Sequence, residues 1–159
     1  MSLYRFIASD NPLPEIDQSG FIRMKVRDLK KMIPVPRSPL PLASWDELDE
    51  NTEVLYAESE EDTGGLHISI CDNPPFGLER YITKAYVYWL GGRFHSKCVD
   101  QLHHYIQTNI REEDRVELWS IWFGDNPEAK LCKTIVLSEL TVADLELLRS
   151  HWHCCIMIE

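Results

Sequence analysis

The pattern of apolar and polar positions is clearest in the middle of the chain, where residues 81–90 read YITKAYVYWL. β-branched and aromatic residues dominate this run, which contains one charge and neither glycine nor proline, as is typical of a strand. Alternate residues of a strand point to opposite faces, and neither set of this run is clearly polar. We therefore predict a strand in the interior of a sheet that is covered on both faces.

After Gly91 the period of the apolar residues changes to that of a helix. Apolar side chains recur at helical spacing over residues 94–109, which predicts an amphipathic helix. Two strand-like runs follow at residues 116–123 and 131–137, and the turn residues at 124–130 join them. This arrangement predicts that the two runs pair as a hairpin.

A second helix and a last strand complete this half of the chain. Thr141 and Asp144 have the spacing of a capping box, and the helix that they begin ends near Ser150. Residues 152–158 read as a closing strand, so the element order over residues 81–158 is β-α-β-β-α-β. This is the order of a ferredoxin-like unit, in which the first and third strands are central and both helices cover one face.

The first 76 residues carry shorter runs with a strand-like pattern. Residues 3–8 and 21–26 alternate as strands do, and residues 54–71 predict a hairpin around an acidic, glycine-bearing loop. Residues 33–41 contain four prolines in nine positions, which predicts a stiff, extended connector.

Together these elements predict an α+β fold. We expect one compact domain over residues 1–159, because a chain of this length suits a single domain. Residues 77–159 would form the ferredoxin-like part, and the β-rich residues 1–76 would either extend its sheet or cover its open face.

The charge of the chain is unevenly distributed. Its net charge is −10, with eleven acidic residues and no lysine or arginine between Ser44 and Glu79. Excess negative charge disfavours nucleic acid and anionic lipid as partners and is compatible with a basic protein. The simpler interpretation is that the acids keep the fold soluble. Neither a secretory signal nor an apolar run long enough to span a membrane is visible, so we expect a cytoplasmic protein.

The acidic stretch supplies the candidate partner-binding residues. Ser44 and Glu47 have capping-box spacing for a short helix, and the predicted hairpin 54–71 would carry further acids at its tip. The candidates are Asp46, Glu47, Asp49, Glu50, Glu58, Glu60, Glu61 and Asp62.

The densest group of potential metal ligands lies at the end of the chain. On a strand, His151, His153 and Cys155 would share one face, and His103 or His104 could add a fourth ligand. The spacing matches no zinc-binding signature, so we expect a buried closing strand, no bound metal and no cofactor. The five cysteines form no C-x-x-C, which favours free thiols.

The sequence contains no catalytic motif, and it therefore favours a protein-binding domain without catalysis. By charge and size, this would be an inhibitor or immunity-type protein for a basic partner. The alternative is a small enzyme or metal-dependent ligand binder that uses the histidine and cysteine cluster. The sequence leaves the identity of the partner, any substrate and the oligomeric state open.

Overall fold

The computed structural model describes residues 2–38, 44–124 and 131–159. Its contacts divide the chain into two compact units, here called unit 1 (Met1–Ser19 and Gly64–Glu159) and unit 2 (Gly20–Thr63). These boundaries differ from the expected one between residues 76 and 77. Two parts of the predictions lie outside the described residues. They are residues 125–130 of the predicted turn 124–130 and residues 39–41 of the predicted connector 33–41.

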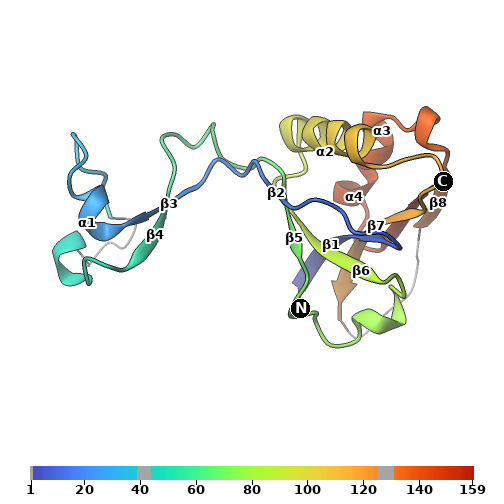
Figure 1. The fold of residues 1–159 in the computed structure, drawn as a ribbon, viewed down its shortest axis with the longest axis horizontal. Coiled ribbons are helices and arrows are strands. Elements are labelled where there is room, and N and C mark those ends of the chain that lie inside the picture. Colours follow the sequence, from blue (N-terminus) through green and yellow to red (C-terminus); the bar gives the residue numbers. More distant parts are fainter. Residues whose placement is uncertain (1, 39–43, 125–130) are drawn as a thin grey trace. The chain divides into compact units, whose positions relative to one another are not determined.

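Unit 1 contains one mixed seven-stranded sheet with the order β2-β5-β6-β1-β7-β9-β8 (Figure 1). The strands are β1 (Ser2–Ser9), β2 (Ile16–Asp17), β5 (His67–Ile70), β6 (Tyr86–Gly91), β7 (Val116–Phe123), β8 (Leu131–Ile135) and β9 (Cys154–Ile158). All neighbouring pairs are antiparallel except β8 and β9, which are parallel. The expected α+β class is confirmed, with a core that consists mostly of sheet.

Three helices cover one face of this sheet (Figure 1). They are α2 (Ser96–Asn109), α3 (Val142–Leu145) and α4 (Leu147–Ser150), and the 3-10 turn η3 (Leu137–Glu139) precedes α3. The apolar stripe predicted for residues 94–109 is confirmed, since Leu102 and Ile106 are fully buried against the sheet. The predicted capping box is confirmed too, because the side chains of Thr141 and Asp144 bond to each other's backbone amides.

The other face of the sheet carries a second, aromatic core. Phe6 lies 5.0 Å from Trp89 between ring centroids, and Tyr81 lies 6.2 Å from Trp119. The segment that covers this face includes the 3-10 helix η2 (Leu78–Arg80). Aromatic pairs at these distances add stability beyond the area that they bury. Both faces are therefore covered, as predicted for the strand over residues 81–90.

The start of that predicted strand is wrong, since β6 begins only at Tyr86. Leu78 and Ile82 are four residues apart on a helical turn, where the amide of Ile82 donates to the carbonyl oxygen of Leu78 at 3.1 Å. Both side chains are buried on the aromatic face. The remaining part of the run does lie inside the sheet, between β5 and β1.

The ferredoxin-like arrangement is not confirmed, because the strand order differs from it. β1 pairs with both β6 and β7, and β9 separates β7 from β8. The N-terminal strand is thus central, which suits its four consecutive buried residues Phe6–Ser9. β8 is exposed at four of its five positions and forms an edge. The predicted hairpin of residues 116–123 and 131–137 is therefore wrong.

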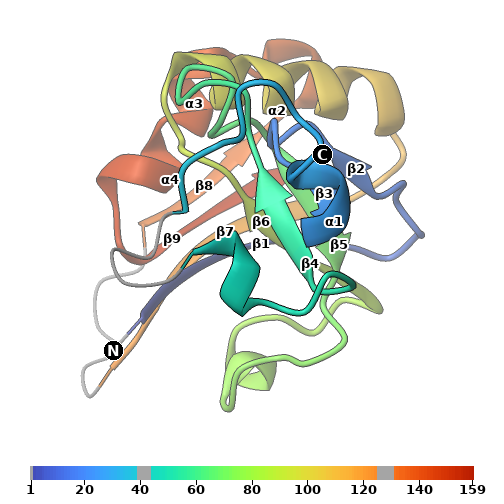
Figure 2. The same cartoon turned by 90° about the vertical axis from the view of Figure 1, so that its left-hand side faces the viewer.

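Unit 2 has a small two-stranded sheet of its own, in which β3 (Ile22–Lys25) and β4 (Glu53–Tyr56) are antiparallel. The four-residue helix α1 (Val26–Leu29) follows β3 directly, and the 3-10 helix η1 (Trp45–Glu47) precedes β4 (Figure 2). The predicted hairpin of residues 54–71 is wrong, because β4 pairs with β3 whereas β5 pairs with β2 and β6.

Candidate functional site

The core of unit 2 is small, and it attaches α1 to the two-stranded sheet. The amide of Val26 donates to the carbonyl oxygen of Thr52 at 3.0 Å, and the next amide donates to the carbonyl oxygen of Glu50 at 3.1 Å. These bonds join the start of α1 to the turn before β4. Val26 and Leu29 are fully buried, so burial of these two apolar side chains fixes α1 against the two-stranded sheet.

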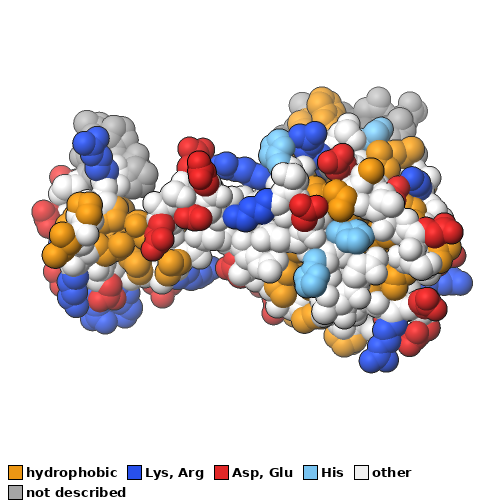
Figure 3. Space-filling model, turned by 90° about the horizontal axis from the view of Figure 1, so that it is seen from above, with side chains coloured by type: hydrophobic (Ala, Val, Ile, Leu, Met, Phe, Trp, Pro, Cys, Tyr) orange, Lys and Arg blue, Asp and Glu red, His pale blue; other side chains and the backbone are white. Residues whose placement is uncertain are grey.

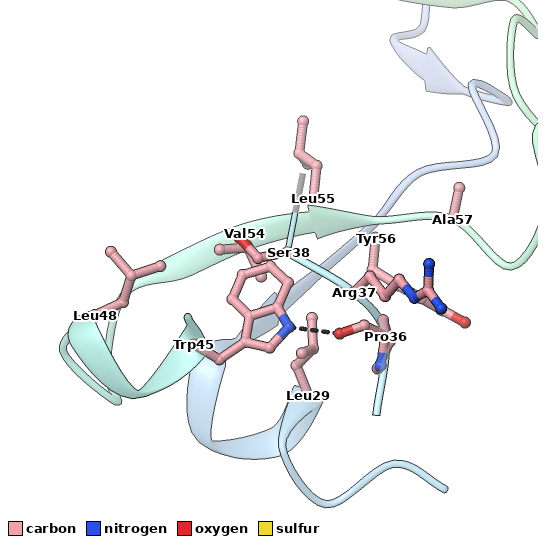
Figure 4. A pocket seen from close by; sticks show the side chains of 10 residues that line it. All are labelled: Leu29, Pro36, Arg37, Ser38, Trp45, Leu48, Val54, Leu55, Tyr56 and Ala57. Atoms are coloured by element: carbon pink, nitrogen blue, oxygen red, sulfur yellow. Dashed lines mark hydrogen bonds between the residues drawn. The ribbon is translucent and has the colours of Figure 1, made fainter. Parts of the chain in front are cut away.

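A pocket of about 520 Å³ lies in unit 2 (Figure 4). Its walls come from Leu29 of α1, Pro36, Trp45 of η1, and residues of β4. The indole Nε1 of Trp45 donates to the carbonyl oxygen of Pro36 at 2.6 Å, which fixes the ring at the edge of the pocket. Its volume lies in the range of pockets that bind small molecules.

Strand alternation explains which side chains of β4 face the pocket. Figure 4 shows the side chain of Tyr56 on the side of the strand where Trp45 and Leu29 lie, and the side chain of Leu55 on the opposite side, although Leu55 and Ala57 also contribute to the lining. The register agrees, because Tyr56 is opposite the apolar Ile22 whereas Leu55 is opposite a charged arginine. The apolar set of the predicted strand 21–26 therefore shares the face of β4 that lines the pocket.

The eight predicted acids are all exposed and all belong to unit 2. The four acids of residues 58–62 do not lie at a hairpin tip as predicted, because that hairpin does not form. Asp46 and Glu47 belong to η1, and residues 58–62 follow β4 in the connection that leads out of unit 2. The predicted capping box at Ser44 is also wrong, since its hydroxyl accepts from the amide of Asp46, at 3.2 Å, and not from the amide of Glu47.

Most of these acids have no cation beside them. Asp46 pairs with Lys30 at 2.9 Å, and Asp62 accepts a bond from the Ser59 hydroxyl at 2.7 Å. Within residues 2–38, 44–124 and 131–159, five of the eight carboxylates have no lysine or arginine within ion-pair distance. They are Glu47, Asp49, Glu50, Glu58 and Glu61.

The pocket and the acids are neighbours along the chain. Three lining residues have acidic neighbours in the sequence. Asp46 follows Trp45, and Glu58 follows Ala57. Leu48 lies between Glu47 and Asp49. One cation, Arg37, also lines the pocket. Consecutive Cα atoms are about 3.8 Å apart, so an apolar pocket lies among carboxylates with one arginine at its edge.

The surface of unit 2 exposes an unusual number of apolar side chains. It carries five of the twelve large apolar side chains that are exposed in the described part of the chain: Phe21, Ile22, Ile33, Val35 and Leu55. Ile33 is 98 % exposed and Leu55 is 63 % exposed. Figure 3 shows hydrophobic side chains gathered on this unit with charged side chains around them. Such surfaces are typical of interaction sites.

The structure does not bring the predicted metal candidates together. His151 is exposed, with its ring nitrogen 2.9 Å from the Ser150 hydroxyl, whereas Cys155 is buried in the aromatic core. The ring of His153 stacks on Tyr81 at 6.2 Å. No group of three or more histidine, cysteine, aspartate or glutamate side chains that could hold a metal ion occurs among the described residues.

The histidines of α2 do not complete such a cluster. His103 shares a hydrogen bond of 3.0 Å between its Nε2 atom and the carbonyl oxygen of Leu140, which joins α2 to the segment before α3. His104 is exposed on the same helix. These positions give His103 a structural role between two elements of unit 1.

The cysteines carry free thiols, and the two in the helix-covered core are poor nucleophiles. Burial raises the pKa of Cys98 and that of Cys154 to about 11, and the positive charge of Arg5 opposes this shift only in part. Because the thiolate is the reactive form, almost none of it is present at neutral pH. Neither thiol is therefore suited to act as a nucleophile in the folded protein.

Comparison of the chain with protein-family models, with curated proteins and with solved structures finds no match. Within the ranges that the structure describes, no helix has the length and apolar character needed to cross a membrane.

Sequence reasoning missed the pocket, although Trp45 and Leu48 stand three residues apart in an otherwise acidic stretch. Such spacing places two apolar side chains on one side of a helical turn and could have indicated it.

Proposed function

We propose that the chain is a protein-binding domain without catalysis, and that unit 2 binds a basic partner through its acidic surface. The observation that carries this proposal is the set of five exposed carboxylates that have no lysine or arginine within ion-pair distance among the described residues. Unit 2 contains ten acidic and six basic residues, a net charge of −4. A surface of this kind attracts a basic protein and speeds the encounter of the two.

The charge also explains why these residues contribute little to the fold. Exposed ion pairs stabilise a protein by roughly 0–1 kcal/mol each, and five of the eight acids form none with the residues that the structure describes. Their number in one short segment therefore fits a role in recognition. The partner would be a basic protein, as in the binding of an inhibitor to a basic toxin or nuclease.

The test is selection of peptides from a random library displayed on phage, with the full chain as bait. We expect the selected peptides to carry a net positive charge and to bind more weakly as salt rises, because the Debye length shrinks. They should lose binding to a variant in which Glu47, Glu50, Glu58 and Glu61 are replaced by lysine. Selection of neutral or acidic peptides, or of peptides that bind this variant equally well, would overturn the proposal.

A further inference from the structure

We propose that the pocket of unit 2 is an anchor site for one aliphatic side chain of the basic partner. Lysine or arginine residues on either side of that side chain would face the carboxylates around the pocket. This inference rests on the proposed function, because it names the segment of the partner that the acidic surface holds. It adds the chemistry that a charged surface alone lacks, which is an apolar contact of defined shape.

The lining of the pocket selects an apolar group. Leu29, Trp45 and Val54 offer side chains without charge, and the indole N–H of Trp45 is already bonded to a backbone carbonyl oxygen. A polar side chain that entered between them would lose its hydrogen bonds to water, which is costly. An aliphatic side chain would instead exchange exposed apolar surface for buried surface, which is favourable.

The charges near the pocket select the residues beside that apolar group. Glu47 precedes Leu48 of the lining and Asp49 follows it, and Glu58 follows Ala57. None of these three carboxylates has a lysine or arginine within ion-pair distance in the described part of the chain. A partner segment with cations on both sides of its apolar residue would supply them. This charge complementarity favours a basic segment over an uncharged apolar molecule.

Arg37 is the one feature of the lining that opposes a basic segment. Its side chain is exposed, and it forms no ion pair with any described residue. Two positive charges at close range repel each other even near a protein surface. Replacement of Arg37 by glutamate should therefore strengthen the binding of a basic segment, which is a gain that an unfolded variant could not show.

The experiment uses three fluorescent synthetic peptides and the full chain: KKLKK, KKAKK and EELEE. We expect KKLKK to bind at least about tenfold more tightly than KKAKK, because the leucine has three more carbon atoms to bury. EELEE should not bind. Arg37→Glu should tighten the binding of KKLKK severalfold, and Val54→Phe, which narrows the pocket at the wall formed by β4, should weaken it toward the level of KKAKK. Amide spectra of each variant check that β3 and β4 still pair.

The outcomes separate this inference from the proposed function. Equal binding of KKLKK and KKAKK, with both lost on reversal of the acids, would overturn the anchor site and leave the acidic surface in place. Equal binding of KKLKK and EELEE would show that the pocket takes an apolar group whatever its charge, which would overturn the basic partner. Failure of all three peptides to bind would overturn the anchor site, while the library selection would still decide on the acidic surface.

Discussion

Substitution of one buried leucine by alanine in each unit should show whether the two units open separately. Leu29 of α1 is 1 % exposed and Leu118 of β7 is fully buried, so the substitution Leu→Ala removes the same atoms from two different cores. Such substitutions destabilise proteins by about 2–5 kcal/mol, with the cost depending on how far the surroundings collapse. We expect Leu29→Ala to fall near the lower limit, since a core of this size can collapse more completely.

The magnitude can be followed by amide hydrogen exchange. A loss of about 2 kcal/mol corresponds to roughly 30-fold faster opening-limited exchange. If unit 2 opens by itself, Leu29→Ala should accelerate the exchange of amides in β3 and β4 by this factor. The amides of β1 and β7, which pair over eight residues, should keep their protection, because local opening has its own free energy.

The matched variant Leu118→Ala should accelerate exchange in the sheet of unit 1. It should also lower the midpoint of global unfolding by more than Leu29→Ala does. The reasoning would be refuted if Leu29→Ala accelerated the amides of β1 and β7 as much as those of β3 and β4. Such a result would mean that the chain unfolds as one cooperative unit, with no separate opening of residues 20–63.

Three further predictions concern single positions. Gly20→Ala should destabilise the protein by several kcal/mol more than Gly77→Ala, measured by urea unfolding: both have a positive φ, but a Cβ at Gly20 would lie 1.8 Å from a backbone oxygen and one at Gly77 would meet no atom within 4 Å. The hydrogen bond from Lys133 lowers the pKa of Asp144. The stability that this carboxylate adds is therefore present above about pH 4 and is lost as pH falls through the lowered pKa. The free energy of unfolding of Asp144→Asn should thus differ most from that of wild type above about pH 4. The Cys98 thiol is fully buried, and burial raises its pKa to about 11, so in the folded protein at about pH 8 it should react with iodoacetamide far more slowly than the exposed Cys132, as mass spectrometry of the two peptides would show.

Local patterns predicted the elements of unit 1 better than their partners. The bounds of β7 and the capping box at Thr141 follow from neighbouring residues alone. The partner of β8 does not follow from neighbouring residues, because β9, which lies between β8 and β7 in the sheet, comes about twenty residues later in the chain. A hairpin was the natural prediction for two successive strands, but α3 and α4 carry the chain across to a parallel pair instead.

The central place of β1 could not be read from its sequence. Arg5 lies in the middle of the strand, which is typical of a half-exposed position, yet its Nε donates to the carbonyl oxygen of Leu148 at 2.9 Å. Its guanidinium lies 4.5 Å from the centre of the Phe94 ring. These partners come from residues distant in sequence, and they allow a charged side chain to lie beside a buried strand.

The candidate site was predicted in part, for a physical reason that the glycines illustrate. The exposure of the acids follows from their charge, but their position depends on Gly64 and Gly65, which read as turn residues of a hairpin. A Cβ at Gly65 would lie 1.8 Å from the carbonyl oxygen of Gln18, so this glycine permits two distant segments to approach closely. The sequence gives no sign that the segment near Gln18 approaches Gly65. Residues 64 and 65 are therefore predicted to lie in the loop of a hairpin, whereas unit 2 ends at Thr63.

The same junction leads to a last prediction, that unit 1 folds without residues 20–63. The strands on either side of this segment pair with each other, since Ile16 is opposite Ile68 and the amide of Gln18 donates to the carbonyl oxygen of Leu66 at 2.7 Å. The ends of the segment are thus already held together, and a short Gly-Ser linker can replace it at little entropic cost. The shortened chain should keep the near-ultraviolet circular dichroism of its aromatic core and a cooperative unfolding transition, and it should lose all binding of KKLKK. Loss of that transition would show that the sheet depends on unit 2, whereas a shortened chain that still bound the peptide would place the binding surface outside unit 2.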